Sequence, residues 1–270
     1  MPTVLTPSGA ALHVEEAGSG RPLVLLHGWS LSSAALLAPL APLAGRARLV
    51  APDLRGHGRS SSPGPHTLED LAADVVQVFT ALDLRGAVLA GWSLGALAAL
   101  AALPALADRV RALALVAGTP CFTQREGWSH ALPARTVEAV AAQVRRDPAR
   151  AARRFFEGMF VPGELDAAGR ARAEALRAAL PAPTAAALLP GLDVLREADL
   201  RPALRAVGVP TLVLHGDADP VCPPGAGHAL AAAIPRARLV LVPGAGHAPF
   251  LSRPGAVVDA LGSLLEEARA

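Results

Sequence analysis

A serine stands between two glycines in Gly91-Trp92-Ser93-Leu94-Gly95, directly after a short apolar run and directly before an alanine- and leucine-rich stretch. A Gly-x-Ser-x-Gly sequence at a strand-to-helix turn exposes the serine hydroxyl above a sheet. The hydroxyl then lies at the positive end of the helix dipole. The glycines avoid the side-chain clashes that larger residues would create in so sharp a turn. The pattern therefore predicts Ser93 as a nucleophile.

A serine hydroxyl needs a base to take its proton, and His247 is the best placed of the eight histidines. It lies in Gly246-His247-Ala248-Pro249, after the last apolar run and before the final helical stretch. Loops that follow parallel strands gather at one edge of a sheet, which is also the edge expected for Ser93. We therefore predict His247 as the general base.

The imidazole in turn needs a carboxylate to fix its tautomer and stabilise its charged form. Asp217 and Asp219 both follow the apolar run 211–214. We predict that Asp219 is the acid because it lies farther along the loop, and Asp217 remains the alternative. The chain order Ser93, Asp219, His247 differs from the order in trypsin-like and subtilisin-like proteases.

Acyl transfer also requires backbone N–H groups that stabilise the developing oxyanion. We expect one from Leu94, the residue after the nucleophile. The other is expected from Trp29, in the loop His27-Gly28-Trp29-Ser30 after an early apolar run, and the Trp29 indole would also form a wall of the acyl pocket. The glycine-rich stretch 53–60 has no Gly-Lys-Ser/Thr ending, so we interpret it as a turn that supports this loop and not as a phosphate loop.

These residues must be positioned by alternating strands and helices. Short apolar runs predict strands at 21–26, 48–51, 87–90, 112–116, 211–214 and 238–242. Helices are expected at 67–82, with Thr67 as N-cap and Asp70 in a capping box, and at 94–103. Continuous apolar strands alternating with helices indicate an α/β fold with a mostly parallel sheet and helices on both faces.

One region interrupts this alternation. Residues 121–191 contain helical arginine- and alanine-rich segments separated by prolines, and no convincing buried strand. We predict an inserted helical lid at 121–191, with the α/β core formed by 1–120 and 192–270. Within the lid, Asp147-Pro148 is typical of a helix start.

The composition excludes several classes of protein. Hydrophobic residues make up 52% and charged residues 18% of the chain, which argues against disorder. The net charge of +2 is too small for general attraction to nucleic acid, and the apolar runs are too short to span a bilayer. No signal peptide is visible, and the two cysteines form no disulfide framework or metal motif. We expect a cytoplasmic monomer with no metal, cofactor, nucleic-acid or membrane partner.

The motifs together resemble the α/β-hydrolase family over nearly the whole chain. They are His27-Gly28-Trp29, the turn 53–60, the Ser93 pentapeptide, His215-Gly216-x-x-Asp219 and Gly246-His247. Within that family the chain resembles the pimeloyl-[acyl-carrier protein] methyl ester carboxylesterases of biotin synthesis. The segments that carry this resemblance are the Ser93 pentapeptide, Thr119-Pro120-Cys121-Phe122 with Trp128, Gly191-Leu192-Asp193-Val194-Leu195, Asp199-Leu200-Arg201 and His247-Ala248-Pro249-Phe250. The chain departs from the pattern at Ser30 and Ala96, where glycines are common, and in the lid.

The resemblance implies an α/β-hydrolase fold and hydrolysis of the methyl ester of pimeloyl-[acyl-carrier protein], and two features of the chain agree with that substrate. Aromatic residues are scarce and concentrate in the motif loops and the lid, which favours an apolar acyl channel. The predicted lining residues are Trp29, Phe122, Phe155, Phe156, Phe160 and Phe250.

The second feature is a cluster of arginines: five arginines and one acid lie between Arg145 and Arg154. On a helix Arg150 and Arg154 share a face that could bind an acidic acyl-carrier protein.

Simpler interpretations exist for both features, namely core packing of the rings and a solvated helix face. Three other functions also remain open for the chain. A general short-chain carboxylesterase, or a lactone or carbon–carbon bond hydrolase, would use the same three residues. A non-catalytic ligand receptor on the same fold could retain them without turnover.

Overall fold

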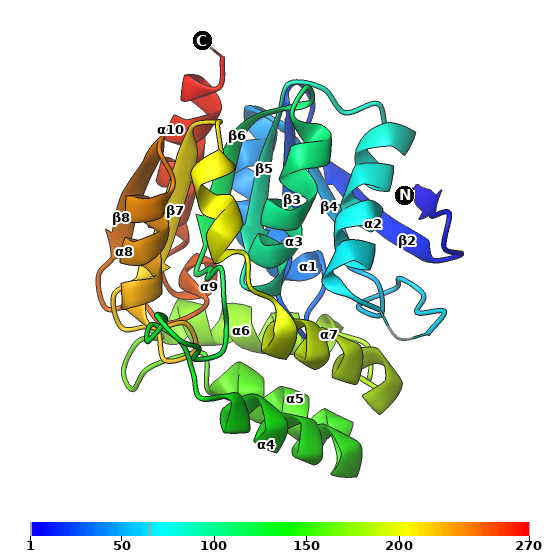
Figure 1. The fold of residues 1–270 in the computed structure, drawn as a ribbon, viewed down its shortest axis with the longest axis vertical. Helices are drawn as coiled ribbons and strands as arrows, with labels where there is room; N and C mark the ends of the chain where they lie inside the picture. Colours follow the sequence, from blue (N-terminus) through cyan, green and yellow to red (C-terminus); the bar gives the residue numbers. More distant parts are fainter. Residues whose placement is uncertain (1, 65, 270) are drawn as a thin grey trace.

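One eight-stranded sheet runs through the part of the chain that the computed structural model describes, residues 2–64 and 66–269 (Figure 1). The strands are β1 (Thr3–Leu5), β2 (Ala11–Ala17), β3 (Pro22–Leu26), β4 (Arg48–Pro52), β5 (Ala87–Trp92), β6 (Val110–Val116), β7 (Thr211–Gly216) and β8 (Ala237–Val242). Their order across the sheet is β1-β2-β4-β3-β5-β6-β7-β8. All pairings from β4 to β8 are parallel, so the predicted mostly parallel sheet is confirmed.

Helices connect the strands and cover both faces of the sheet. They are α1 (Ala34–Leu40), α2 (Leu68–Ala81), α3 (Leu94–Ala102), α4 (Ala134–Arg146), α5 (Pro148–Glu157), α6 (Ala167–Ala179), α7 (Ala185–Glu197), α8 (Pro224–Ala233), α9 (Pro249–Ser252) and α10 (Pro254–Glu267), with 3-10 turns η1 (Ala41–Gly45), η2 (Leu103–Leu106) and η3 (Arg201–Ala206). Helices α2, α3 and α8 pack on one face, whereas α1 and α10 pack on the other.

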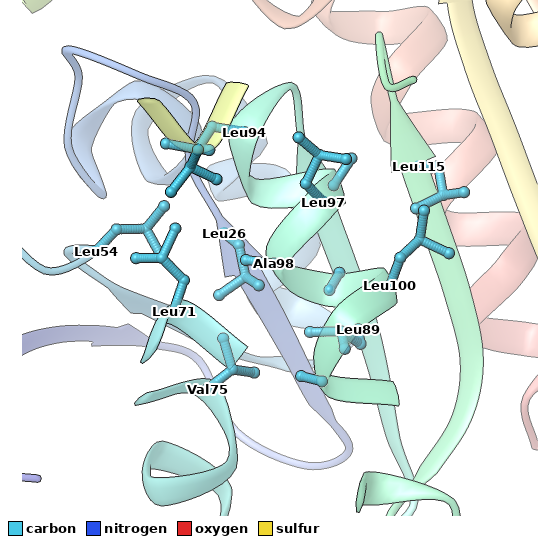
Figure 2. Close-up of a cluster of buried hydrophobic side chains, with 14 of the residues drawn as sticks. Leu26, Leu54, Leu71, Val75, Leu89, Leu94, Leu97, Ala98, Leu100 and Leu115 are labelled. Atoms are coloured by element: carbon cyan, nitrogen blue, oxygen red, sulfur yellow. The ribbon is translucent and has the colours of Figure 1, made fainter. Parts of the chain in front are cut away.

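The strands alternate their side chains between two separate cores. In β5, Leu89 belongs to the core under α3, and its neighbours Val88 and Ala90 belong to the core under α10. Figure 2 shows the first of these cores, where side chains of α3 meet those of β3, β5, β6 and α2. Because every residue of β5 is buried, both faces of the central strand are covered, and the end of this strand is firmly positioned.

Two predicted helix starts are confirmed by their caps. Thr67 and Asp70 form a reciprocal capping box at the start of α2. At the start of α5 the Asp147 carboxylate accepts the N–H of Arg150 at 2.9 Å, with Pro148 in the first turn. Each cap satisfies backbone N–H groups that have no partner inside the helix.

The strands β1 and β2 are absent from the prediction. In β2 the buried residues are Leu12 and Val14. The polar His13 lies between them, and Glu15 and Glu16 follow. This strand pairs antiparallel with both β1 and β4 at the margin of the sheet. A search for continuous apolar runs cannot find such a half-buried marginal strand.

Helices α4 to α7 lie between β6 and β7 in the chain and gather beyond one end of the sheet, below it in Figure 1. The predicted lid boundary at 191/192 falls inside α7, which continues through Pro190 to Glu197. The carboxyl ends of the parallel strands point toward these helices. No helix within residues 2–64 and 66–269 combines the length and the apolar character needed to cross a membrane.

Candidate active site

Ser93 occupies the sharp turn between β5 and α3. Its φ of 55° and ψ of −115° lie outside the ordinary regions for residues with a side chain, and its N–H donates to the Val116 carbonyl at 3.1 Å. A Cβ on Gly91 would collide with the backbone of Gly95, and a Cβ on Gly95 would collide with the Leu26 carbonyl. The strained turn can therefore form only with glycines at these two places.

A chain of two hydrogen bonds joins Ser93, His247 and Asp219. His247 Nε2 lies 2.9 Å from Ser93 Oγ, and His247 Nδ1 lies 2.8 Å from Asp219 Oδ2. Since an ionised carboxylate can only accept, Nδ1 carries the ring proton and Nε2 is left to accept the Ser93 hydroxyl. All three residues are buried, with Ser93 only 6% exposed. The geometry is that of a nucleophile, its base and an orienting acid.

Asp219 is fixed as a hydrogen-bond acceptor by its own loop. Its Oδ1 accepts the N–H groups of Val221 at 2.8 Å and Cys222 at 2.9 Å. Burial alone would raise the pKa of the Asp219 carboxyl, but the neighbouring His247 and His215 hold that pKa below its usual range. The other candidate, Asp217, is exposed and accepts the N–H of Gly244 at 2.7 Å. The structure thus brings Asp219, and not Asp217, to the histidine.

Leu94 follows Ser93 directly, and Trp29 follows Gly28 in the loop that lies against Ser93. Within residues 2–64 and 66–269, neither the Leu94 N–H nor the Trp29 N–H is used in a hydrogen bond. A Cβ on Gly28 would lie 3.2 Å from Ser93 Cβ, which places the Trp29 loop directly beside the nucleophile. Ser30, the next residue, has a φ of 63°, so the chain turns back immediately after Trp29. Two unused donors beside a hydroxyl can stabilise an oxyanion.

The stretch 53–60 supports this loop, as the sequence predicts. Asp53 accepts the N–H of Ser33 at 2.7 Å and that of Arg59 at 2.8 Å through its two oxygens. His27 Nε2 accepts the N–H of Leu54 at 2.9 Å. Burial lowers the pKa of His27, which keeps the ring neutral and able to accept this bond.

Comparison with known proteins agrees with this geometry. The family model described as alpha/beta hydrolase fold matches residues 21–254. The chain belongs to the α/β-hydrolase family. It is 36% identical to a pimeloyl-[acyl-carrier protein] methyl ester esterase of Nitrosomonas europaea, over 94% of this chain and 100% of that protein. It is 37% identical to the protein of that name from Xanthomonas campestris, over 93% of this chain and 97% of that one.

Solved structures support the same family. An esterase from Exiguobacterium antarcticum superposes with a TM-score of 0.91 at 26% identity, covering 98% of both chains. A thermophilic esterase from Thermogutta terrifontis gives a TM-score of 0.86 at 27% identity, covering 100% of this chain and 99% of that one. The α/β-hydrolase fold and the kinship to esterases therefore rest on both sequence and structure.

An apolar cavity of about 270 Å³ adjoins this α/β-hydrolase site. Trp29, Phe122 and Phe155 form its aromatic walls, and Pro220 and Val221, which follow Asp219, border it. The Trp29 and Phe155 rings meet edge to face with centroids 4.9 Å apart, and the Trp29 indole N–H donates to the Leu188 carbonyl at 2.8 Å. Trp29 therefore lies in the loop beside the nucleophile and also forms one wall of the cavity.

A larger hollow of about 600 Å³ lies between the 56–64 turn and the segment 180–190. Neither Trp29 nor the loop of Asp219 lines it. The smaller cavity adjoins both Trp29 and the loop of Asp219.

Three of the phenylalanines predicted to line the acyl channel lie elsewhere. Phe156 and Phe160 face a different hollow, between α5 and α6, with ring centroids 5.7 Å apart. Phe250 is fully buried and packs edge to face on Trp92. The expectation of a single channel lined by all five phenylalanines is therefore wrong: Phe156 points away from its neighbour Phe155 on α5, and Phe160 and Phe250 lie in other segments. Only Phe122 and Phe155 line the cavity.

The arginines of α4 and α5 lie on the surface. They are Arg135, Arg145, Arg146, Arg150, Arg153 and Arg154, and all are exposed. No ion pair within the described ranges uses any of them. Arg154 also lines the apolar cavity, so positive charge stands at its rim. Within the same ranges, no group of three or more His, Cys, Asp or Glu side chains could hold a metal ion.

Two contacts to the base loop escape sequence reasoning. The Trp92 indole N–H donates to the His247 carbonyl at 2.8 Å, and the Met159 carbonyl accepts the His247 N–H at 2.8 Å. Trp92 occupies a variable position of the pentapeptide, and Met159 lies in the inserted region. No sequence pattern predicts these two contacts; only the folded chain brings Trp92 and Met159 beside His247.

Proposed function

We propose that this chain is a serine carboxylesterase that hydrolyses the methyl ester of pimeloyl-[acyl-carrier protein] in biotin synthesis. The observation that carries the reaction type is the buried hydrogen-bond chain from Ser93 through His247 to Asp219. The relatives named pimeloyl-[acyl-carrier protein] methyl ester esterase support the substrate.

The proposed mechanism has two halves. His247 Nε2 takes the Ser93 proton while Ser93 Oγ attacks the ester carbonyl, and the N–H groups of Trp29 and Leu94 stabilise the oxyanion. The imidazolium, stabilised by Asp219, gives its proton to the departing methanol and leaves an acyl group on Ser93. A water molecule then attacks this acyl group, and its proton passes to His247. Return of that proton to Ser93 releases the acid.

The cavity and the lid helices support the substrate class. The walls of the cavity are apolar, which suits the methylene chain between the two carbonyl groups of a pimeloyl unit. We propose that α4 to α7 form a lid over this chain. The unpaired Arg150 and Arg154 would then bind the acidic carrier protein where the chain leaves the cavity. Because the proposed substrate is bound to an acyl-carrier protein, we propose that the enzyme acts in the cytoplasm.

A comparison of two substrates tests the proposal. The variant Arg150→Gln/Arg154→Gln should lower kcat/KM for methyl pimeloyl-carrier protein by roughly tenfold, which corresponds to about 1.4 kcal/mol. Turnover of p-nitrophenyl butyrate should stay within twofold of wild type. Arg111→Gln/Arg205→Gln, which removes two exposed arginines outside α4 and α5, serves as the matched control. Equal loss on both substrates, or no loss on either, would contradict the carrier-binding role.

The general short-chain esterase and the ligand receptor give other results. A general esterase would hydrolyse p-nitrophenyl butyrate with Ser93-dependent kinetics but would not release methanol from methyl pimeloyl-carrier protein. A receptor would show no Ser93-dependent turnover of either ester. Ser93→Ala is the control in both assays.

A further inference from the structure

A buried carboxylate of the inserted region holds the loop that carries His247. Glu164 lies between α5 and α6 and is only 4% exposed. Its Oε1 accepts the N–H of Gly246 at 2.8 Å, and its Oε2 accepts the N–H of Val161 at 2.9 Å. Gly246 and Glu164 are 82 residues apart in the chain, so this contact joins the inserted region to the edge of the sheet.

The next N–H of the same loop is taken by the same segment. The Met159 carbonyl accepts the His247 N–H at 2.8 Å, one residue after the bond to Glu164. A Cβ on Gly246 would collide with the Met159 carbonyl and lie 2.7 Å from Glu164 Oε2. The backbone before His247 therefore lies directly against residues 159–164, with no room for a side chain between them.

A third bond anchors Glu164 from the other side. Arg253 Nη1 donates to the Glu164 carbonyl at 3.0 Å and also to the Ser252 carbonyl at 3.0 Å. Ser252 ends α9, which follows His247. Glu164 is thus bonded to the chain both before and after the histidine.

These contacts fix the part of His247 that the hydrogen bonds of its ring do not fix. The ring nitrogens are held by Ser93 and Asp219, and the His247 carbonyl is held by the Trp92 indole. The N–H groups of Gly246 and His247 are both held by the inserted segment. A displacement of a reacting group by about 1 Å can lower a rate by roughly a hundredfold.

We propose that Glu164 is a positioning residue for the catalytic base, so that the inserted region contributes to the chemical step as well as to binding. This inference rests on the proposed function, because it presupposes that His247 serves Ser93. It assigns Glu164 no contact with the substrate. The carboxylate acts through the Gly246 N–H and so on the placement of the His247 ring.

The test is the kinetics of Glu164→Ala and Glu164→Gln with p-nitrophenyl butyrate, with kcat calculated per active serine after titration with a phosphonate. Glu164→Ala should lower kcat by roughly tenfold or more and leave KM within about twofold. Glu164→Gln keeps one carbonyl acceptor but loses the second, so it should recover part of the lost kcat.

Asp166→Ala is the matched control for lid stability. The Asp166 carboxylate caps α6 by accepting the N–H of Gly169 at 2.6 Å. Its loss should lower Tm without changing kcat per active serine. If Glu164→Ala does not fold, Glu164→Gln and Arg253→Gln provide the same test with smaller changes in volume or charge. Both should lower kcat more than Asp166→Ala does.

Wild-type kcat per active serine in both Glu164→Gln and Arg253→Gln would overturn the inference. If Ser93→Ala is inactive in the same assay, that result leaves the proposed function intact. If Ser93→Ala retains wild-type turnover, the proposed function fails and the positioning role fails with it.

Discussion

The Nε2 atom of His247 lies 2.9 Å from Ser93 Oγ, although 154 residues separate the two in the chain. Ser93 is carried by the end of β5 and His247 by the loop after β8. The parallel sheet brings both to one edge, where a turn that requires glycines at 91 and 95 directs the serine hydroxyl at His247. The relationship links the fold directly to acyl transfer.

The role of Asp219 predicts a contrast with its neighbour. Asp219→Asn should lower kcat for p-nitrophenyl acetate by roughly a thousandfold or more, because an amide can donate to His247 Nδ1 and so stabilise the wrong tautomer. Asp217→Asn should stay within a few-fold of wild type, since the Asp217 carboxylate is exposed and accepts the N–H of Gly244 instead of a histidine proton. Steady-state kinetics of the two variants measure this contrast. A larger loss of kcat in Asp217→Asn than in Asp219→Asn would contradict the assignment of Asp219 as the acid.

The cavity predicts which phenylalanine senses acyl length. Phe155→Ala removes the ring that meets Trp29, so kcat/KM for p-nitrophenyl hexanoate should fall by roughly tenfold, and for the acetate much less. Phe160→Ala, on the α5–α6 hollow, should change the hexanoate-to-acetate ratio by less than about twofold. Equal ratios in both variants would remove Phe155 from the acyl site.

The buried His57 predicts a pH dependence of stability. Burial, and then the neighbouring His27, lower the pKa of His57 from 6.5 to about 3. Below about pH 6.5 the unfolded chain takes up a proton that the fold excludes, so this group destabilises the fold progressively between pH 6.5 and 3. His57 changes the slope of the unfolding free energy against pH by at most about 1.4 kcal/mol per pH unit.

Urea unfolding of wild type and His57→Asn between pH 5 and 6.5 measures this effect. The variant should show a shallower fall of the unfolding free energy as pH decreases, whatever its stability at pH 8. Parallel curves for the two proteins would show that His57 does not titrate differently on folding.

A buried ion pair predicts a stability effect away from the site. Arg55 donates to both carboxylate oxygens of Asp74, at 2.8 and 2.6 Å, and both side chains are 4% exposed. Asp74→Ala leaves the guanidinium buried without its partner, so the unfolding free energy should fall by about 3–5 kcal/mol. Arg55→Met/Asp74→Leu should lose less. A loss below about 1 kcal/mol in the single variant would mean that the pair is readily replaced.

Much of the core and the reacting groups could be predicted from the sequence. The strands of the parallel sheet are buried on both faces, so they read as continuous apolar runs, and the chemistry follows their carboxyl ends. The strands β1 and β2 contain no continuous run of buried apolar residues, so the search for such runs does not predict them. The sequence predicts helix starts accurately where a side chain caps the helix, as at Thr67 and Asp147.

The contacts made by the inserted region could not be predicted from the sequence. Phe155 and Phe156 are adjacent, yet one lines the cavity and the other a separate hollow, because a helix turns successive side chains by about 100°. The bonds from Met159 and Glu164 to the His247 loop join segments that no local pattern relates. Contacts of this kind depend on how the helices pack against the sheet. Composition and residue spacing do not predict that packing.

The most direct test of the central claim is rapid-quench mass spectrometry of the protein mixed with methyl pimeloyl-carrier protein. The proposed mechanism predicts release of methanol together with a transient acyl group on the peptide that contains Ser93. Neither signal should occur in Ser93→Ala. Methanol release that persists in Ser93→Ala, or the absence of methanol release by wild type, would contradict the account.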